Sequence, residues 1–251
     1  MAASSADKQK VIQLAQKKRT AKAIALCSRI CKANKNDAEA WFMLAGLNIE
    51  LNNMEEVVTD LNNVIRIQPD HVAAHYNRGV ALQKLKRLEE SENSYREAIR
   101  LQPDYALAHA KLCHALRELG EYDEAAKSCQ QAVNLKPQFA DAHNMLGLVL
   151  LDQKKFDAAE SCFKTALGIS PQDSSAHYNL GLCNLTQEKF GPAKACYEQA
   201  LQINPNFADA INDLGLVLKE EEKPEQARHQ FERALAIEPK LAMAHNNLGN
   251  V

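Results

Sequence analysis

The sequence predicts an all-α protein, a solenoid of 34-residue helix-turn-helix repeats. Proline recurs in one register at an interval of 34 residues, at Pro69, Pro103, Pro137, Pro171, Pro205 and Pro239. Small residues recur at two fixed places within each interval. Between these places the apolar residues follow the 3.6-residue period of a helix and not the alternation of a strand. Self-similarity at a fixed period of this length is typical of repeat architectures.

Numbering the proline as position 32 places the repeat boundaries. Six full repeats are expected, at residues 38–71, 72–105, 106–139, 140–173, 174–207 and 208–241. Residues 1–37 are expected to form a degenerate, basic hairpin of the same kind, with Lys35 at the place of the proline. Residues 242–251 are the first half-helix of a further, truncated repeat. Because solenoids end in a polar capping helix, we expect the sequence to be part of a longer protein.

The first helix of each repeat carries an apolar residue at position 7 and a small residue at position 8. Glycine inside a helix costs about 1 kcal/mol relative to alanine, so its recurrence there indicates close approach of another helix. The residues at position 8 are Ala45, Gly79, Cys113, Gly147, Gly181, Gly215 and Gly249.

The second helix carries small residues at positions 20 and 27 and a larger one at position 24. The proline at position 32 ends this helix. Pro192 and Pro224 lie near the start of a second helix, where a missing N–H is tolerated. The residues at position 24 are Leu61, Tyr95, Cys129, Phe163, Tyr197 and Phe231.

The repeat resembles the tetratricopeptide repeat. The clearest match is His143-x2-Leu146-Gly147-x2-Leu150, then Ala159-x3-Phe163-x2-Ala166, then Pro171. This resemblance implies a right-handed superhelix whose concave groove is lined by the first helix of each repeat. The asparagines at position 6 are similar to those that line the groove of O-linked N-acetylglucosamine transferases, whose side chains hold a substrate polypeptide.

Composition and charge exclude several classes of protein. Nine Lys or Arg and one acid, Asp7, lie in residues 1–36, and the remaining residues are acidic overall, which argues against a nucleic-acid groove along the molecule. The longest apolar run, residues 146–151, is too short to span a bilayer. The first residues do not form a secretory signal. Seven cysteines, an odd number, favour a reducing cytoplasmic location with free thiols.

No motif for catalysis or for a cofactor is present, so we predict that the chain is not an enzyme. The histidines at position 4 suggest a metal ladder, but neighbouring helices lie about 8–10 Å apart, too far to share one ion. We therefore predict that these rings fill a packing slot, the one that Trp41 occupies in residues 38–71. They are His75, His109, His143, His177 and His245.

Function is expected in the variable positions that face the groove. At position 6 the candidates are Asn77, Lys111, Met145, Asn179, Asp213 and Asn247. Asparagine both donates and accepts hydrogen bonds, so it can hold the backbone of an extended peptide. His114 and Arg117 add basic character beside Lys111, and Asp209 adds acidic character beside Asp213. The lysine and asparagine set with which some family members bind a C-terminal carboxylate is absent.

These observations predict a scaffold that binds a protein or peptide partner in its groove. Two alternatives remain open. One is the substrate-recognition arm of a larger glycosyltransferase or sulfotransferase that continues beyond Val251. The other is a self-assembling structural protein, in which the acidic C-terminal end of one copy stacks head-to-tail on the basic N-terminal hairpin of the next.

Overall fold

The computed structural model describes residues 5–251, which are helical apart from short connections and contain no strand. The chain divides into two compact units, Met1–Leu135 and Lys136–Val251, called here the N-terminal and the C-terminal unit. The helices of the N-terminal unit are α1 (Ser5–Gln16), α2 (Thr20–Ala33), α3 (Ala38–Glu50), α4 (Met54–Ile67), α5 (Val72–Lys84), α6 (Leu88–Leu101), α7 (Ala106–Glu118) and α8 (Tyr122–Leu135).

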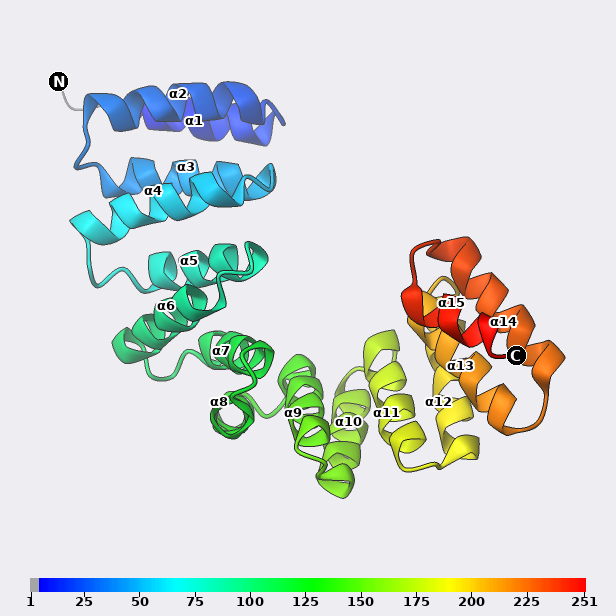
Figure 1. Ribbon diagram of the computed structural model, residues 1–251. Helices are drawn as coiled ribbons and strands as arrows, with labels where there is room; N and C mark the ends of the chain where they lie inside the picture. The colour runs from blue at the N-terminus through cyan, green and yellow to red at the C-terminus, as the bar shows by residue number, and fades with distance from the viewer. Residues whose placement is uncertain (1–4) are drawn as a thin grey trace. The chain divides into compact units, whose positions relative to one another are not determined.

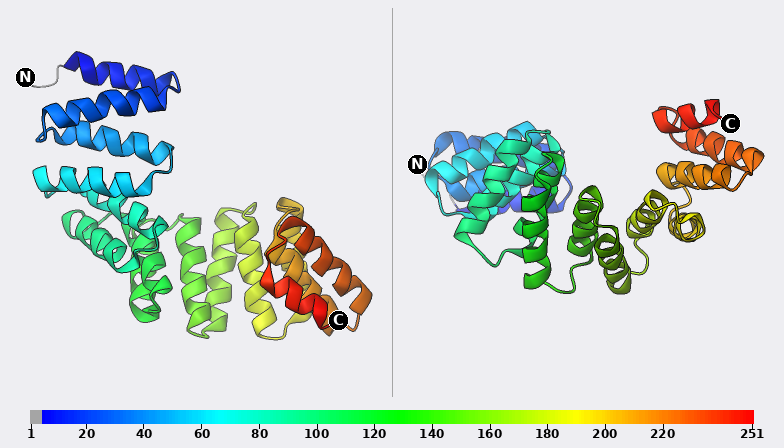
Figure 2. Two further views of the ribbon diagram at one scale, coloured as in Figure 1. Left: turned by 45° about the horizontal axis from the view of Figure 1, so that its top comes forward. Right: turned by 60° about the horizontal axis from the view of Figure 1, so that its bottom comes forward.

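The C-terminal unit continues the same pattern of antiparallel hairpins. Its helices are α9 (Ala140–Asp152), α10 (Phe156–Ile169), α11 (Ser174–Thr186), α12 (Phe190–Ile203), α13 (Ala208–Glu220), α14 (Pro224–Ile237) and α15 (Ala242–Gly249). Within each unit every helix packs against the next one along the chain (Figures 1 and 2). The predicted all-α repeat array is therefore confirmed. None of the helices within residues 5–251 combines the length and the apolar character needed to cross a membrane.

In four hairpins a glycine at position 8 contacts an aromatic ring at position 24. A Cβ atom on Gly181 would lie 2.6 Å from Cε1 of Tyr197, so only glycine lets the ring approach the first helix this closely. The same relation holds between Gly215 and the ring of Phe231. Both rings are fully buried. Burial of a large aromatic ring against a helix backbone is a main source of hairpin stability.

The α7–α8 hairpin departs from this arrangement and corrects the expectation of free thiols. Cys113 at position 8 and Cys129 at position 24 form a disulfide with an S–S distance of 2.12 Å. The expectation was wrong for these two residues because spacing along the sequence does not show which side chains of two packed helices come into contact. Five cysteines are free: Cys27, Cys31, Cys162, Cys183 and Cys196.

The turn inside each hairpin contains one residue with left-handed backbone conformation. Gly120 has a φ of 82° at this place, and Lys154, with a φ of 59°, occupies the equivalent place in the α9–α10 turn. Left-handed backbone costs roughly 1–2 kcal/mol for a residue that carries a Cβ. The non-glycine residues of this kind, each 34 residues from the next or from Gly120, are Lys18, Asn52, Lys86, Lys154, Glu188 and Glu222.

The residue at position 4 joins each repeat to the end of the preceding one. The Nε2 atom of His177 donates a hydrogen bond of 3.0 Å to the carbonyl oxygen of Pro171. Trp41 makes the equivalent contact, since its Nε1 atom donates to the carbonyl oxygen of Lys35. These rings thus make a hydrogen bond that spacing did not predict, and among the histidines only His75 is buried. The same bond to the preceding proline is made by His75, His109, His143 and His245.

Consecutive first helices also approach one another directly. In the C-terminal unit α9 contacts α11, α11 contacts α13, and α13 contacts α15, whereas successive second helices of this unit show no comparable contact in the described part of the chain. The first helices therefore lie on the concave side of this unit. We call the surface on which they meet the first-helix face.

Candidate functional site

Hydrogen bonds between neighbouring first helices organise the first-helix face of the C-terminal unit. The side chain at position 6 of one repeat bonds to the side chain at position 5 of the preceding repeat. Asn179 donates to Asn144 Oδ1 at 3.0 Å, and Asn247 donates to Asn212 Oδ1 at 2.9 Å. Two of the predicted groove asparagines thus use one amide hydrogen to join repeats, which fixes the orientation of their side chains.

Asp213 occupies position 6 between these two pairs and lies at the centre of a polar network. Tyr178 Oη donates to its Oδ2 atom at 3.1 Å, and Asn212 Nδ2 donates to its Oδ1 atom at 2.9 Å. Asp213 as a whole residue is 8% exposed, and burial raises the pKa of its carboxyl group, while the two hydrogen bonds act in the opposite direction. The carboxylate of Asp209 raises the pKa further.

The groups that act on Asp213 in the described structure include no cation. A buried carboxylate is normally paired with a positive charge, since its desolvation costs several kcal/mol. Asp213 instead relies on neutral donors and lies near a second acid, the exposed Asp209. This arrangement makes the surface attractive to a positively charged group from outside.

Apolar side chains also lie on the first helices of this unit. Position 9 of three successive repeats carries a half-buried leucine: Leu148, Leu182 and Leu216. Met145, at position 6, is half-buried on the same helix as Leu148. The first-helix face of the C-terminal unit therefore combines a row of apolar side chains with carboxylates.

In the N-terminal unit, His114 is half-buried and accepts a hydrogen bond at Nδ1 from the side-chain amide of Gln83. Gln83 in turn accepts a bond of 3.1 Å from Tyr95 Oη. Burial lowers the pKa of His114, an effect that Lys111 and Arg117 reinforce and Glu118 opposes. The neutral imidazole is thus favoured, and His114 contributes less positive charge than its residue type suggests.

The other predicted residues of this unit lie on α5 and α7. Lys111 is exposed, whereas Arg117 and Asn77 are half-buried. Glu118, one turn beyond His114, forms an ion pair of 2.8 Å with Lys86, which lowers the pKa of the glutamate. The structure therefore leaves Lys111 as the exposed cation among the predicted residues of α7.

An apolar hollow that the sequence did not reveal lies between α1 and α3. Its volume is ≈ 420 Å³. Val11, Ile12, Met43 and Leu47 line it, and Gly46 leaves open space in which a Cβ would meet no atom within 4 Å. A glycine at position 9, where other repeats carry larger residues, is the signal that could have found it.

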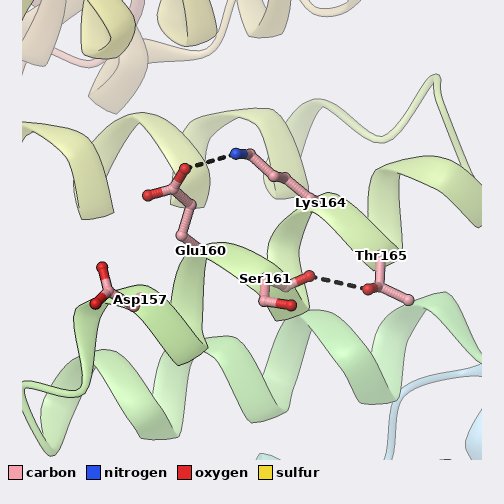
Figure 3. Close-up of a pocket in the computed structure, with 5 residues that line it drawn as sticks. All are labelled: Asp157, Glu160, Ser161, Lys164 and Thr165. Atoms are coloured by element: carbon pink, nitrogen blue, oxygen red, sulfur yellow. Dashed lines mark hydrogen bonds and ion pairs between the residues drawn. The ribbon is translucent and has the colours of Figure 1, made fainter.

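A second hollow, of ≈ 550 Å³, lies along α10 in the layer of second helices (Figure 3). Two of its charged groups pair with each other, since Lys164 Nζ lies 2.6 Å from Glu160 Oε1. The Thr165 hydroxyl donates to the backbone carbonyl of Ser161 at 2.9 Å. Exposed Asp157 is the other charged group of the lining, and one exposed carboxylate does not make a binding site, so we do not take this hollow as a candidate site.

The structure thus separates the predicted residues into two sets. Asn77, Lys111, His114 and Arg117 belong to the N-terminal unit, and the others belong to the C-terminal unit. Residues at position 5, namely Tyr178, Asn144 and Asn212, were missing from the candidates. The signal that could have found them is the recurrence of a polar pair at a spacing of 35 residues.

Comparison with protein families gives matches over most of the chain. Four models described as tetratricopeptide repeat match the chain. One matches residues 38–71, a second matches both 72–105 and 174–207, a third matches 110–174, and a fourth matches 196–229. A search of curated protein sequences found no match. No finding indicates a particular similarity to the O-linked N-acetylglucosamine transferases.

Solved structures confirm the fold. A chain of the crystal structure of the APC/C hetero-tetramer Cut9–Hcn1 is 18% identical with a TM-score of 0.78, and the match covers 99% of this chain and 49% of that chain. The chain thus spans about half the length of that relative. PilF of Pseudomonas aeruginosa is 20% identical with a TM-score of 0.71, and the match covers 85% of this chain and 97% of PilF. YrrB, described as a TPR protein with an unusual peptide-binding site, is 21% identical with a TM-score of 0.56, and the match covers 74% of this chain and 96% of YrrB.

Proposed function

Since the chain belongs to the tetratricopeptide repeat family over most of its length, we propose that it is a non-catalytic scaffold for a protein partner. The first-helix face of the C-terminal unit binds an extended, basic polypeptide segment. The observation that carries this proposal is Asp213, a buried carboxylate held by neutral donors and lacking a cation among the groups that act on it.

A lysine or arginine from the partner would supply the missing counter-charge. Tyr178 and Asn212 hold the carboxylate in a fixed orientation, so little conformational entropy is lost when the partner binds. A charge-assisted hydrogen bond is roughly twice as strong as a neutral one. Asp209, exposed on the same helix, would steer the partner toward the site through longer-range attraction.

The apolar row would supply the rest of the affinity. Leu148, Leu182 and Leu216 occur once per repeat, so they suit an extended segment whose apolar side chains alternate with basic ones. Asn179 and Asn247 retain one amide hydrogen each beyond the bond between repeats, and this hydrogen can serve the partner's backbone. YrrB, whose described peptide-binding site belongs to the same fold, is a precedent for such use.

The N-terminal unit offers the opposite charge. Lys111 is exposed on α7, and Arg117 follows it on the same helix. We propose that acidic side chains of a partner bind there. This second contact is independent of the first and is tested separately, with Lys111→Gln.

The test of the main proposal is binding of fluorescent peptides to the full chain, followed by anisotropy. The probes are an extended peptide of alternating lysine and leucine and a matched peptide of alternating glutamate and leucine. We expect the basic peptide to bind more tightly than the acidic one, with affinity that falls as salt increases. Asp213→Asn should weaken binding about tenfold, since a charge-assisted bond becomes a neutral one.

A matched control is Asp157→Asn, which removes the same charge from α10, in the layer of second helices. This variant should bind the basic peptide within about twofold of the unchanged chain, because exposed charges away from the site contribute little. Circular dichroism would verify that both variants remain folded. Equal weakening by the two substitutions, or equal binding of the two peptides, would contradict the proposal.

A further inference from the structure

The disulfide of the α7–α8 hairpin stands where other hairpins have an aromatic ring. In four hairpins a glycine at position 8 faces a ring at position 24: Gly79 and Tyr95, Gly147 and Phe163, Gly181 and Tyr197, and Gly215 and Phe231. In α7–α8 the two positions hold Cys113 and Cys129, both fully buried and bonded to each other. One hairpin thus exchanges a packing contact for a covalent bond.

Because a disulfide replaces the ring, the stability of this hairpin depends on the oxidation state of two sulfurs. A buried ring stabilises its hairpin under all redox conditions, because its contribution is burial of apolar surface. Two thiols fill less volume than a ring and leave helix α8 without a large side chain at position 24. The disulfide compensates by restraining the unfolded chain, here over a sequence separation of 16 residues.

We propose that Cys113 and Cys129 form a redox site that controls the local stability of the α7–α8 hairpin. In the oxidised form the bond holds the two helices together. In the reduced form the hairpin opens more often than the four hairpins that contain a ring. Helix α7 carries Lys111 and His114, so the change reaches the first-helix side of the N-terminal unit. The inference does not depend on the function proposed above.

The chemistry is thiol–disulfide exchange with a small disulfide or dithiol. In the oxidising direction, one cysteine thiolate attacks a sulfur of glutathione disulfide and releases one glutathione thiolate. The second cysteine then attacks the mixed disulfide and releases the other. The two thiol protons pass to the two glutathione thiolates, so the protein loses two electrons and glutathione disulfide gains them. Dithiothreitol reverses the reaction and becomes the cyclic disulfide.

Burial adds a kinetic consequence. Both sulfurs are fully buried, so a thiolate reaches them only when the hairpin opens. Reduction of the folded protein should therefore be slower than reduction in denaturant. The other five cysteines are free thiols, and three of them, Cys27, Cys31 and Cys183, are buried.

The test is hydrogen exchange with mass spectrometry on the full chain, after treatment with glutathione disulfide or with dithiothreitol. Alkylation should count five thiols in the oxidised protein and seven in the reduced protein. On reduction we expect amides of α7 and α8 to exchange roughly 100-fold faster, as expected for loss of a cross-link over a loop of this size. Amides of α11 and α12 should not change.

The matched variant is Cys113→Gly with Cys129→Tyr, which installs the pair found in α5–α6. It should show no response to dithiothreitol in α7 and α8. Seven alkylated thiols after treatment with glutathione disulfide would overturn the proposal. The proposal would also be overturned if amides of α7 and α8 exchanged hydrogen at the same rate in the fully reduced protein as in the oxidised protein. This result does not depend on whether the variant folds. A variant that folds and responds to dithiothreitol as the unchanged chain does would also overturn it.

Discussion

A Cβ atom on Gly147 would lie 2.5 Å from Cε1 of Phe163. The ring of the second helix therefore occupies the space that a methyl group on the first helix would need. Phe163 is fully buried and has no room to withdraw.

Gly147→Ala should destabilise the protein because the new methyl group overlaps the ring. Overpacking of a buried site costs about 1–3 kcal/mol, more than the roughly 1 kcal/mol that alanine gains over glycine in a helix. The measurement is the free energy of unfolding from urea denaturation. The control is Gly168→Ala in α10, where a Cβ would meet no atom within 4 Å. That substitution should stabilise by about 0.5–1 kcal/mol, and the same sign for both would contradict the packing argument.

Lys154→Gly should stabilise the protein, because Lys154 has a φ of 59° that costs a residue with a Cβ about 1 kcal/mol. Greater freedom of glycine in the unfolded chain offsets part of the gain, so we expect about 0.5 kcal/mol. The opposite change at the equivalent place, Gly120→Ala, should destabilise by about 1 kcal/mol. Thermal unfolding of both variants tests the pair, and a stabilising Gly120→Ala would show that this backbone conformation is not maintained in solution.

His177→Phe should lower the free energy of unfolding by about 0.5–1.5 kcal/mol, the usual contribution of one hydrogen bond. Phenylalanine keeps a ring in the slot but cannot donate to the carbonyl oxygen of Pro171, which His177 Nε2 contacts at 3.0 Å. Urea denaturation measures the change. His229→Phe, at an exposed histidine of α14, should have an effect of less than about 0.5 kcal/mol. Similar values for the two variants would mean that the bond to the proline carbonyl contributes nothing.

Asp60 should make stability depend on pH in the acidic range. Burial raises the pKa of this carboxyl group from 3.8 to about 6, while the hydrogen bond from Asn48 Nδ2 at 2.9 Å opposes the shift. Between these two values the unfolded chain is ionised and the folded chain is protonated, so stability decreases as pH rises and is level above about pH 6. Urea denaturation at a series of pH values should show this decrease, and Asp60→Asn should remove it. An unchanged slope in the variant would assign the pH dependence to other groups.

The sequence by itself determined the helices and their period. Proline at position 32, glycine at position 8 and apolar residues at helical spacing are local signals, and each acts within one hairpin. For that reason the all-α repeat array could be predicted. The candidate residues at position 6 also follow from this register, since helical geometry assigns a face to every position.

Only the tertiary structure decided what those side chains do. Whether Asn179 is a free groove residue or a partner of Asn144 depends on how closely two first helices approach. The burial of Asp213 between Tyr178 and Asn212 depends on three side chains from two helices. Cys113 and Cys129 are 16 residues apart, and only the packing of α7 on α8 brings their sulfurs into bonding distance. Desolvation and contact between helices are set by distances in space, which a pattern of residue types along the chain does not specify.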